Sequence, residues 1–270
     1  GSGESSSSPI YGSGTDGSIY KTRGSTNGVL YTTTYEIASD STVSTSGTVI
    51  FANEEIIING KLNGTGGGGS GWDGACIYGD CSGPEAPSPG VVTEWSSKDI
   101  SDLSNPITQS FENLANIPWG GRGGGGGNFE YVDEGSDYVQ VDSDTVGGDG
   151  CAMITLVAPK ITVNGEIIVS GTDGEDGSEC RDGEYRDDFA EAGADGGDAG
   201  SAILASPSIS GTGSLINHIG HGGTGAECEL GDSDLDDNGF PSNMYIRNGP
   251  DGSDGSSGVT VCYDNSNTIC

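Results

Sequence analysis

The stretch that decides the fold reads TVIFANEEIIINGKLNGTG and runs from Thr48 to Gly66. A second stretch, ITLVAPKITVNGEIIVSG at residues 154–171, repeats its pattern, and ILASPSISGTGSLINHIG at residues 203–220 repeats it more loosely. When the copies are aligned, the coinciding positions are Ile56, Ile161 and Ile209; Gly60, Gly165 and Gly213; and Leu62, Ile167 and Leu215.

Alternating apolar positions in these copies predict short strands with one face inward, and Asn-Gly predicts a tight turn with positive φ angles. Stacking such units over a narrow interior predicts an all-β, β-solenoid or β-helix-like single domain with glycine-rich loops. At most one short helix is expected, at residues 104–117, with Pro106 near its start. The alternative is a β-sandwich of unrelated hairpins. Residues 1–18 are expected to form an extended arm and residues 19–270 the glycine-rich all-β domain.

Composition excludes several classes of function. The chain has 270 residues with 41 Asp and Glu against 9 Lys and Arg, which gives a formal net charge of -32. Such a charge repels phosphate backbones and anionic headgroups, so a nucleic-acid partner is not expected. No run of about 20 apolar residues is present, so membrane insertion is not expected either. With 51 Gly and 31% hydrophobic residues, the core should be thin.

Glycine tracts follow each copy of the repeat. Ordering a glycine tract costs much backbone entropy, so we expect close backbone packing against other tracts or subunits to hold these segments, as only glycine permits in collagen. The acidic run at residues 173–188 and the shorter one at residues 251–254 are expected to be solvated.

The seven cysteines indicate a disulfide framework formed in an oxidising compartment. Six cysteines allow 15 pairings; short loops favour the pairs Cys76–Cys81 and Cys262–Cys270, and Cys180 and Cys228 are paired because they flank the third copy of the repeat. Cys151 opens an apolar run, so it is expected to be the buried free thiol.

Apolar-Asn-Gly-x-apolar strands beside polyglycine runs, as at residues 59–69, resemble glycine-rich surface proteins and viral tail-fibre adhesins. The resemblance covers most of residues 11–225 and is one of sequence style. It implies an extracellular or virion-surface role that is structural or adhesive.

A calcium site is predicted at residues 232–239, where carboxylates alternate before a glycine. Its ligands would be Asp232, Asp234, Asp236, Asp237 and Asn238. The EF-hand pattern needs a Gly at the sixth position and a Glu at the twelfth, and Asp237 and Asn243 stand there, so the loop is not an EF-hand. A plain solvated acidic loop is the alternative.

Other candidate sites are weaker. Trp72 and Trp119 could stack on sugar rings or cover bare glycine backbone, and Asn63 begins a glycosylation sequon. His218 and His221 are interpreted as ordinary loop histidines rather than zinc ligands. No nucleophile elbow or phosphate-binding loop is present, so the chain is not expected to be an enzyme; a β-helical polysaccharide-degrading enzyme is the alternative.

These observations predict a secreted structural subunit that assembles with copies of itself into an extracellular filament, sheath or surface coat. The alternative function is a viral tail-fibre or spike adhesin that binds a cell-surface glycan. In either case the location would be extracellular or on a cell or virion surface. Residues 1–11 of the arm are expected to dock on a neighbouring subunit.

Overall fold

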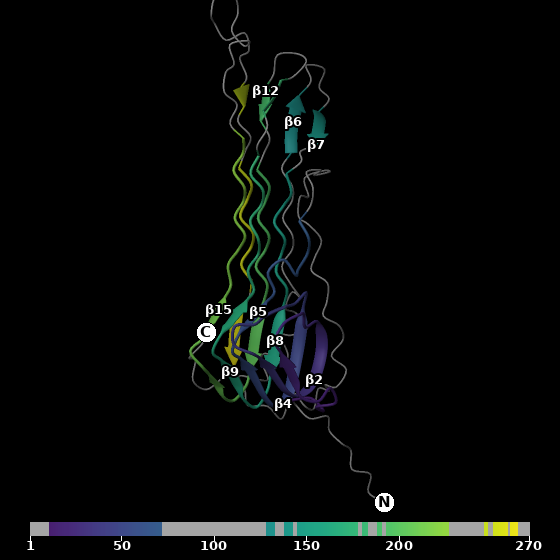
Figure 1. Ribbon diagram of the computed structural model, residues 1–270. Coiled ribbons are helices and arrows are strands. Elements are labelled where there is room, and N and C mark those ends of the chain that lie inside the picture. The colour runs from purple at the N-terminus through teal and green to yellow at the C-terminus, as the bar shows by residue number, and fades with distance from the viewer. Residues whose placement is uncertain are drawn as a thin grey trace, which may run out of the picture.

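The computed structural model describes residues 11–71, 128–132, 138–142, 145–177, 180–182, 188–190, 193–226, 246–247, 251–258 and 260–263. Its two largest sheets pack into a base, from which extended glycine-rich segments run side by side to a far end that carries further short strands (Figure 1). Among these residues no helix is found, and therefore none that is long and apolar enough to cross a membrane.

The eight-stranded sheet of the base is entirely parallel, with the order β1-β2-β4-β8-β13-β17 and with β9 and β14 joined to β4. Its strands are β1 (Ile19–Lys21), β2 (Gly28–Ile37), β4 (Thr48–Ile58), β8 (Ile154–Val157), β9 (Ile161–Val163), β13 (Ala202–Ala205), β14 (Ile209–Ser210) and β17 (Thr260–Tyr263).

A four-stranded parallel sheet, in the order β15-β10-β5-β3, forms the other side of the base. Its strands are β3 (Thr42–Ser44), β5 (Lys61–Asn63), β10 (Glu166–Ile168) and β15 (Ser214–Ile216). Two small sheets lie at the far end of the glycine-rich segments (Figure 1). They comprise β6 (Asn128–Val132) with β7 (Tyr138–Asp142), and β11 (Cys180–Asp182), β12 (Asp188–Ala190) and β16 (Ile246–Arg247).

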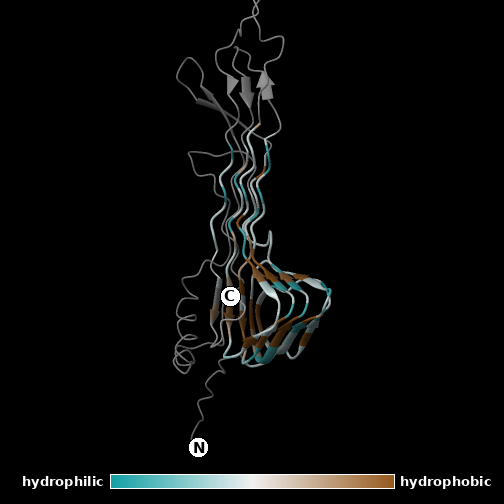
Figure 2. Ribbon diagram, turned by 90° about the vertical axis from the view of Figure 1, so that its left-hand side faces the viewer, coloured by the Kyte–Doolittle hydropathy of each residue, from teal (hydrophilic) through white to brown (hydrophobic). Residues whose placement is uncertain are grey.

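The alignment of the three sequence copies is confirmed by the strand register. Ile161 of β9 is paired with Ile56 on one side and Ile209 on the other, and Ile167 of β10 is paired with Leu62 and Leu215. Because equivalent residues stand side by side, the apolar positions of the copies form continuous rows in one core. Figure 2 shows hydrophobic residues gathered in the base, while the glycine-rich segments are mostly polar or neutral.

The predicted β-solenoid or β-helix-like fold is wrong. The described chain forms parallel strands in two main sheets, the strand arrangement of α/β proteins. The first half of β4 and all of β8 and β13 are buried at every residue, so this part of the eight-stranded sheet is covered on both faces. The strands of a solenoid that wraps a single interior would alternate between buried and exposed positions instead.

The copies are also not successive turns of one winding, because the chain leaves the base for a glycine-rich segment after β5, β10 and β15. The β-sandwich alternative fails as well, since all strand pairs in the two main sheets are parallel and sandwiches are built from antiparallel sheets. The predicted helix at residues 104–117 lies outside the described residues.

The turns after β4 and β9 do not have the positive φ angles that the Asn-Gly pairs predicted. Gly60 and Gly165 are absent from the glycines with positive φ, so left-handed backbone is not the reason for glycine there. A Cβ on Gly165 would instead collide with the carbonyl oxygen of Gly60 in the neighbouring turn. The side-chain amide of Asn164 donates to Oδ1 of Asn59 at 2.8 Å across the same two turns. The Asn-Gly pairs thus allow the turns to stack closely.

We expect Ile161→Ala to lower the free energy of unfolding of the base by about 2–5 kcal/mol, because the side chain is fully buried between Ile56 and Ile209. Thr162→Ala in the same strand is the matched control and should change it by less than about 0.5 kcal/mol, since this residue is only half-buried. Urea unfolding followed by circular dichroism measures both values. Equal effects of the two substitutions would contradict the described register.

Candidate functional site

Six extended segments form what we call the glycine-rich bundle: residues 64–71, 145–153, 169–177, 193–201, 217–226 and 251–258. Their backbone hydrogen bonds recur every third residue. The N–H groups of Gly171, Gly174 and Gly177 donate to the carbonyl oxygens of His218, His221 and Thr224, at 2.9, 2.8 and 2.8 Å. A period of three residues is that of a left-handed polyproline-II helix, in which a segment such as 193–200 spans about 25 Å at about 3.1 Å per residue.

Segment 193–201 lies at the centre of the bundle and bonds to four neighbours. It donates from Gly197 to Thr172 and from Gly196 to Ser253, both at 2.9 Å. Its carbonyl oxygens accept from Gly148 at 2.8 Å and from Gly220 at 2.9 Å. Seven of its residues are buried, and Asp195 and Asp198 are the two that are half-buried. The backbone therefore provides most of the contacts that in an ordinary core come from side chains.

This packing requires residues without a Cβ. A Cβ on Gly197 would overlap the carbonyl oxygen of Asp149, and one on Gly174 would overlap the carbonyl oxygen of Ala194. Both glycines lack a positive φ, so close approach of neighbouring backbones is what selects glycine here. The prediction that backbone packing holds the glycine tracts is confirmed for these segments.

Carboxylates complete the hydrogen bonding of the bundle. Asp195 and Asp198 each accept an N–H from segment 251–258, at Ser253 and Ser256, both at 2.6 Å. Asp173 and Asp176 accept from His221 and Thr224 at 2.8 and 2.7 Å, and Asp251 and Asp254 accept from Gly225 and Gly222, both at 3.0 Å. Each of these backbone N–H groups donates to a side-chain oxygen of a neighbouring segment. We call these six aspartates the carboxylate clamps.

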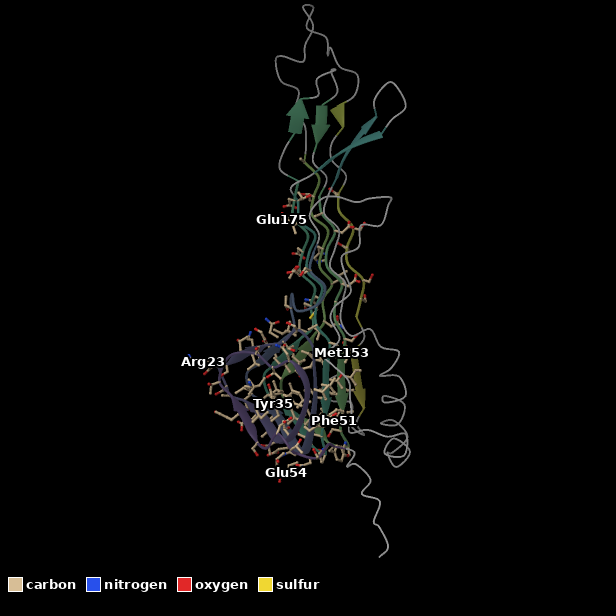
Figure 3. All side chains as sticks on the ribbon, turned by 90° about the vertical axis from the view of Figure 1, so that its right-hand side faces the viewer. Arg23, Tyr35, Phe51, Glu54, Met153 and Glu175 are labelled. Atoms are coloured by element: carbon tan, nitrogen blue, oxygen red, sulfur yellow. The ribbon has the colours of Figure 1, made fainter. Side chains whose placement is uncertain are left out.

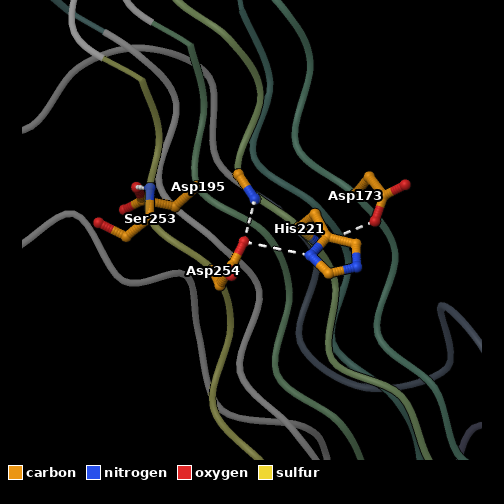
Figure 4. A network of polar contacts seen from close by, with 6 residues as sticks. Asp173, Asp195, His221, Ser253 and Asp254 are labelled. Carbon is orange, nitrogen blue, oxygen red and sulfur yellow. Dashed lines mark hydrogen bonds and ion pairs between the residues drawn. The ribbon is translucent and has the colours of Figure 1, made fainter.

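The clamps correct the expectation of purely solvated charge for Asp173 and Asp176 in the run 173–188, and for Asp251 and Asp254 in the run 251–254. Figure 4 shows the clamps around His221: its N–H donates to Asp173, and its Nδ1 lies 3.3 Å from Oδ1 of Asp254. Glu175, which projects from the bundle in Figure 3, accepts the N–H of Val146 at 3.0 Å in the same way. The sequence contains a signal for this role, because Asp and Gly recur at steps of three in GTDGEDG (residues 171–177) and DGSDGSSG (residues 251–258).

Hydrogen bonding sets the acidity of two clamps. The N–H and hydroxyl of Thr224 hold the pKa of Asp176 below 3.8, the value of an ordinary aspartate. The N–H of Gly222, followed by the His221 side chain, lowers the pKa of Asp254 from the same value. Both carboxylates are therefore charged at neutral pH, and the bundle carries their negative charge at its surface.

Cys151 lies where segment 145–153 meets the base and is buried and free, as predicted from the sequence. Burial raises the pKa of its thiol to about 12, against the lowering effect of backbone hydrogen bonds from Gly200 and Ala152. A thiol of such high pKa is protonated at physiological pH and is a poor nucleophile. The position of Cys151 thus fits a packing role and not a catalytic one.

The structure brings together few of the other predicted site residues. The calcium-loop residues Asp232, Asp234, Asp236, Asp237 and Asn238 and the tryptophans Trp72 and Trp119 lie outside the described residues, as do Cys76, Cys81, Cys228 and Cys270. Cys180 is in β11, and Cys262 is disulfide-bonded, so its predicted pairing with Cys270 stays a prediction. Asn63 is half-buried at the end of β5, and its Oδ1 accepts the Thr65 N–H at 3.0 Å.

His218 and His221 are both exposed on segment 217–226. Within the described ranges, no group of three or more His, Cys, Asp or Glu side chains is arranged to hold a metal ion. Comparison of the chain with models of known protein families, with curated proteins and with solved structures gave no match.

We expect Gly197→Ala to destabilise the bundle by about 1–3 kcal/mol or more, because a Cβ placed against a backbone carbonyl cannot be relieved by a change of rotamer. Ser253→Ala, which changes an exposed side chain and keeps the backbone N–H that Asp195 accepts, should be neutral. Hydrogen exchange of residues 193–201 measures the difference. Unchanged protection in Gly197→Ala would contradict the packing of this segment.

Acid should weaken the bundle. A carboxyl group with a lower pKa in the folded chain than in the unfolded one stabilises the fold above the unfolded pKa, and this contribution is lost as pH falls through the folded pKa. Since the pKa values of Asp176 and Asp254 lie below 3.8, the melting temperature should be steady from pH 7 to about 5 and fall below about pH 4. Replacing both residues by Asn, which keeps an acceptor oxygen, should make the acid-induced fall smaller. If the melting temperatures of the parent and the variant fell equally with pH, this prediction would be refuted.

Proposed function

We propose that this chain is an extracellular display protein of the adhesin type, in which the base supports the glycine-rich bundle and the far end of the bundle binds a cell-surface glycan. The observation that carries the proposal is the direction of the six segments. Residues 64–71, 169–177 and 217–226 each follow a strand of the base, namely β5, β10 and β15. Residues 145–153, 193–201 and 251–258 each precede one, namely β8, β13 and β17.

It follows that the chain leaves and re-enters the bundle at the same end three times, at residues 71 and 145, 177 and 193, and 226 and 251. The base and the bundle thus act as a support, and the described strands of the three connections, β6, β7, β11, β12 and β16, lie at the end away from the base (Figure 1). Binding residues are found disproportionately on loops that a rigid scaffold positions. This arrangement supports a role in presenting those connections to a partner.

Two further observations support the proposal, the first its extracellular location and the second its glycan ligand. Cys262 is disulfide-bonded, and disulfides persist in oxidising compartments. Trp72 and Trp119, the side chains expected to stack on sugar rings, both belong by sequence to the first of the three connections. Trp72 follows directly after segment 64–71.

The self-assembling filament or coat subunit, which the sequence analysis favoured over the adhesin, is the competing proposal. It differs from the adhesin in what the purified chain does by itself: a subunit forms regular polymers, whereas an adhesin stays a discrete particle that binds a surface. Electron micrographs of the purified chain separate the two, and regular fibres would favour the subunit.

The adhesin function is tested by replacing residues 178–192 and 227–250 with Gly-Ser linkers, with Trp72→Ala as a second, smaller change. We expect the parent chain to bind a defined subset of a glycan array and both variants to lose at least tenfold in affinity, with unchanged hydrogen exchange of residues 193–201. Lys160→Gln, on the base, is the control and should bind as the parent does. A parent chain that binds no glycan on the array, or a linker variant that binds equally well, would overturn the proposal.

A further inference from the structure

Residues 12–26, which we call the edge segment, cover the end of the base at β2 and β3. The N–H of Asp16 donates to the carbonyl of Tyr31 at 2.9 Å, and that of Thr33 donates to Gly17 at 2.8 Å. Farther along, the N–H of Ser44 donates to Gly24 at 3.0 Å. These bonds satisfy backbone groups that β2 and β3 would otherwise leave open.

One stretch of the edge segment, the strand β1, has a neighbouring strand on one side only among the described residues. The strand β1 is paired with β2 and with no other described strand. The carbonyl of Lys21 accepts the N–H of Ala38 at 2.9 Å on the β2 side, so the alternate residue, Tyr20, directs its own N–H and C=O away from β2. Such an edge is a template on which a further strand can pair.

The side chains at this edge differ from those of the rest of the described chain. The Tyr20 side chain is 63% exposed and is the single exposed large hydrophobic residue in the described ranges. Thr22, Arg23, Gly24 and Ser25 are all exposed after it, and a Cβ on Gly24 would have nothing within 4 Å. Figure 3 shows Arg23 at the outer side of the base, away from the bundle. The edge is therefore accessible over several consecutive residues.

Charge makes the same edge distinctive. The other two described lysines are neutralised, because Lys61 lies 2.7 Å from Glu166 and Lys160 lies 3.1 Å from Glu55. Lys21 instead donates to the backbone carbonyl of Ser25 at 3.1 Å, and Arg23 has no carboxylate within ion-pair distance among the described residues. In a chain of net charge -32, Lys21 and Arg23 thus place two positive charges, two residues apart, at an edge where no described carboxylate pairs with them.

We propose that β1 is a docking edge for an acidic, extended segment of a partner protein. The partner segment pairs with the outward N–H and C=O of Tyr20 as an additional strand, packs an apolar side chain on the Tyr20 ring, and places carboxylates beside Lys21 and Arg23. A second copy that offers the same edge is a poorer occupant, since it would place its own Lys21 and Arg23 beside these two cations. The docking edge does not depend on the adhesin function, because it lies on the base and not at the far end of the bundle.

The opposing explanation is that Lys21 and Arg23 only blunt the edge and keep it from pairing with anything. The test uses two fluorescein-labelled peptides, Val-Asp-Val-Glu-Val-Asp and its uncharged counterpart with Asn for Asp and Gln for Glu, and measures anisotropy on titration with the full chain. Lys21→Gln with Arg23→Gln removes two positive charges at the edge. Lys61→Gln with Lys160→Gln removes the same charge elsewhere on the base and is the matched control.

We expect the acidic peptide to bind at least tenfold more tightly than the uncharged peptide and to protect the Tyr20 amide from hydrogen exchange. The edge variant should lose at least tenfold in affinity, Tyr20→Ala should lose about threefold or more, and the control variant should bind as the parent does. An equal loss in edge and control variants would show that net charge alone attracts the peptide and would overturn the proposal. Absence of acidic-peptide binding to the parent chain, which the blunting explanation predicts, would overturn it as well.

Discussion

The structure outside the base depends on how closely glycine backbones can approach one another. In the bundle, a donor such as Gly197 meets the carbonyl of Thr172 directly, and the space that a side chain would fill is occupied by another peptide group. An interior of this kind is held by hydrogen bonds rather than by the burial of apolar surface. This explains how a chain with so low an apolar content orders segments that carry few apolar side chains.

The same constraint gives the acidic residues a structural use. Some backbone N–H groups at the surface of the bundle do not donate to a backbone carbonyl. The short side chain of an aspartate on the neighbouring segment accepts their hydrogen bonds instead. A carboxylate accepts hydrogen bonds but donates none, so it suits a row of donors. Using aspartates in this way adds negative charge to the bundle, and the few cations of the chain do not balance it.

The sequence predicted part of this architecture. Repetition of apolar residues about Gly60, Gly165 and Gly213 was sufficient to predict which strands pair, since register follows from matching apolar positions. The layers were not predicted, because a short run such as Ile154–Val157 is apolar at most positions and does not show whether one or both faces are covered. The clamps were not predicted for a different reason: the partner of Asp195 is a backbone N–H 58 positions away, and only the packing of the segments brings the two together.

The three-residue period restricts how such a protein can change in length. Inserting a single residue into one segment would turn every later donor by a third of a revolution and point the aspartates at the wrong neighbours. Growth is compatible with the lattice only in multiples of three, made in matching places on adjoining segments. This rule does not apply to the connections between the segments, so natural variation in sequence and in length should accumulate there. The length of the glycine-rich bundle should change rarely, and by three residues at a time.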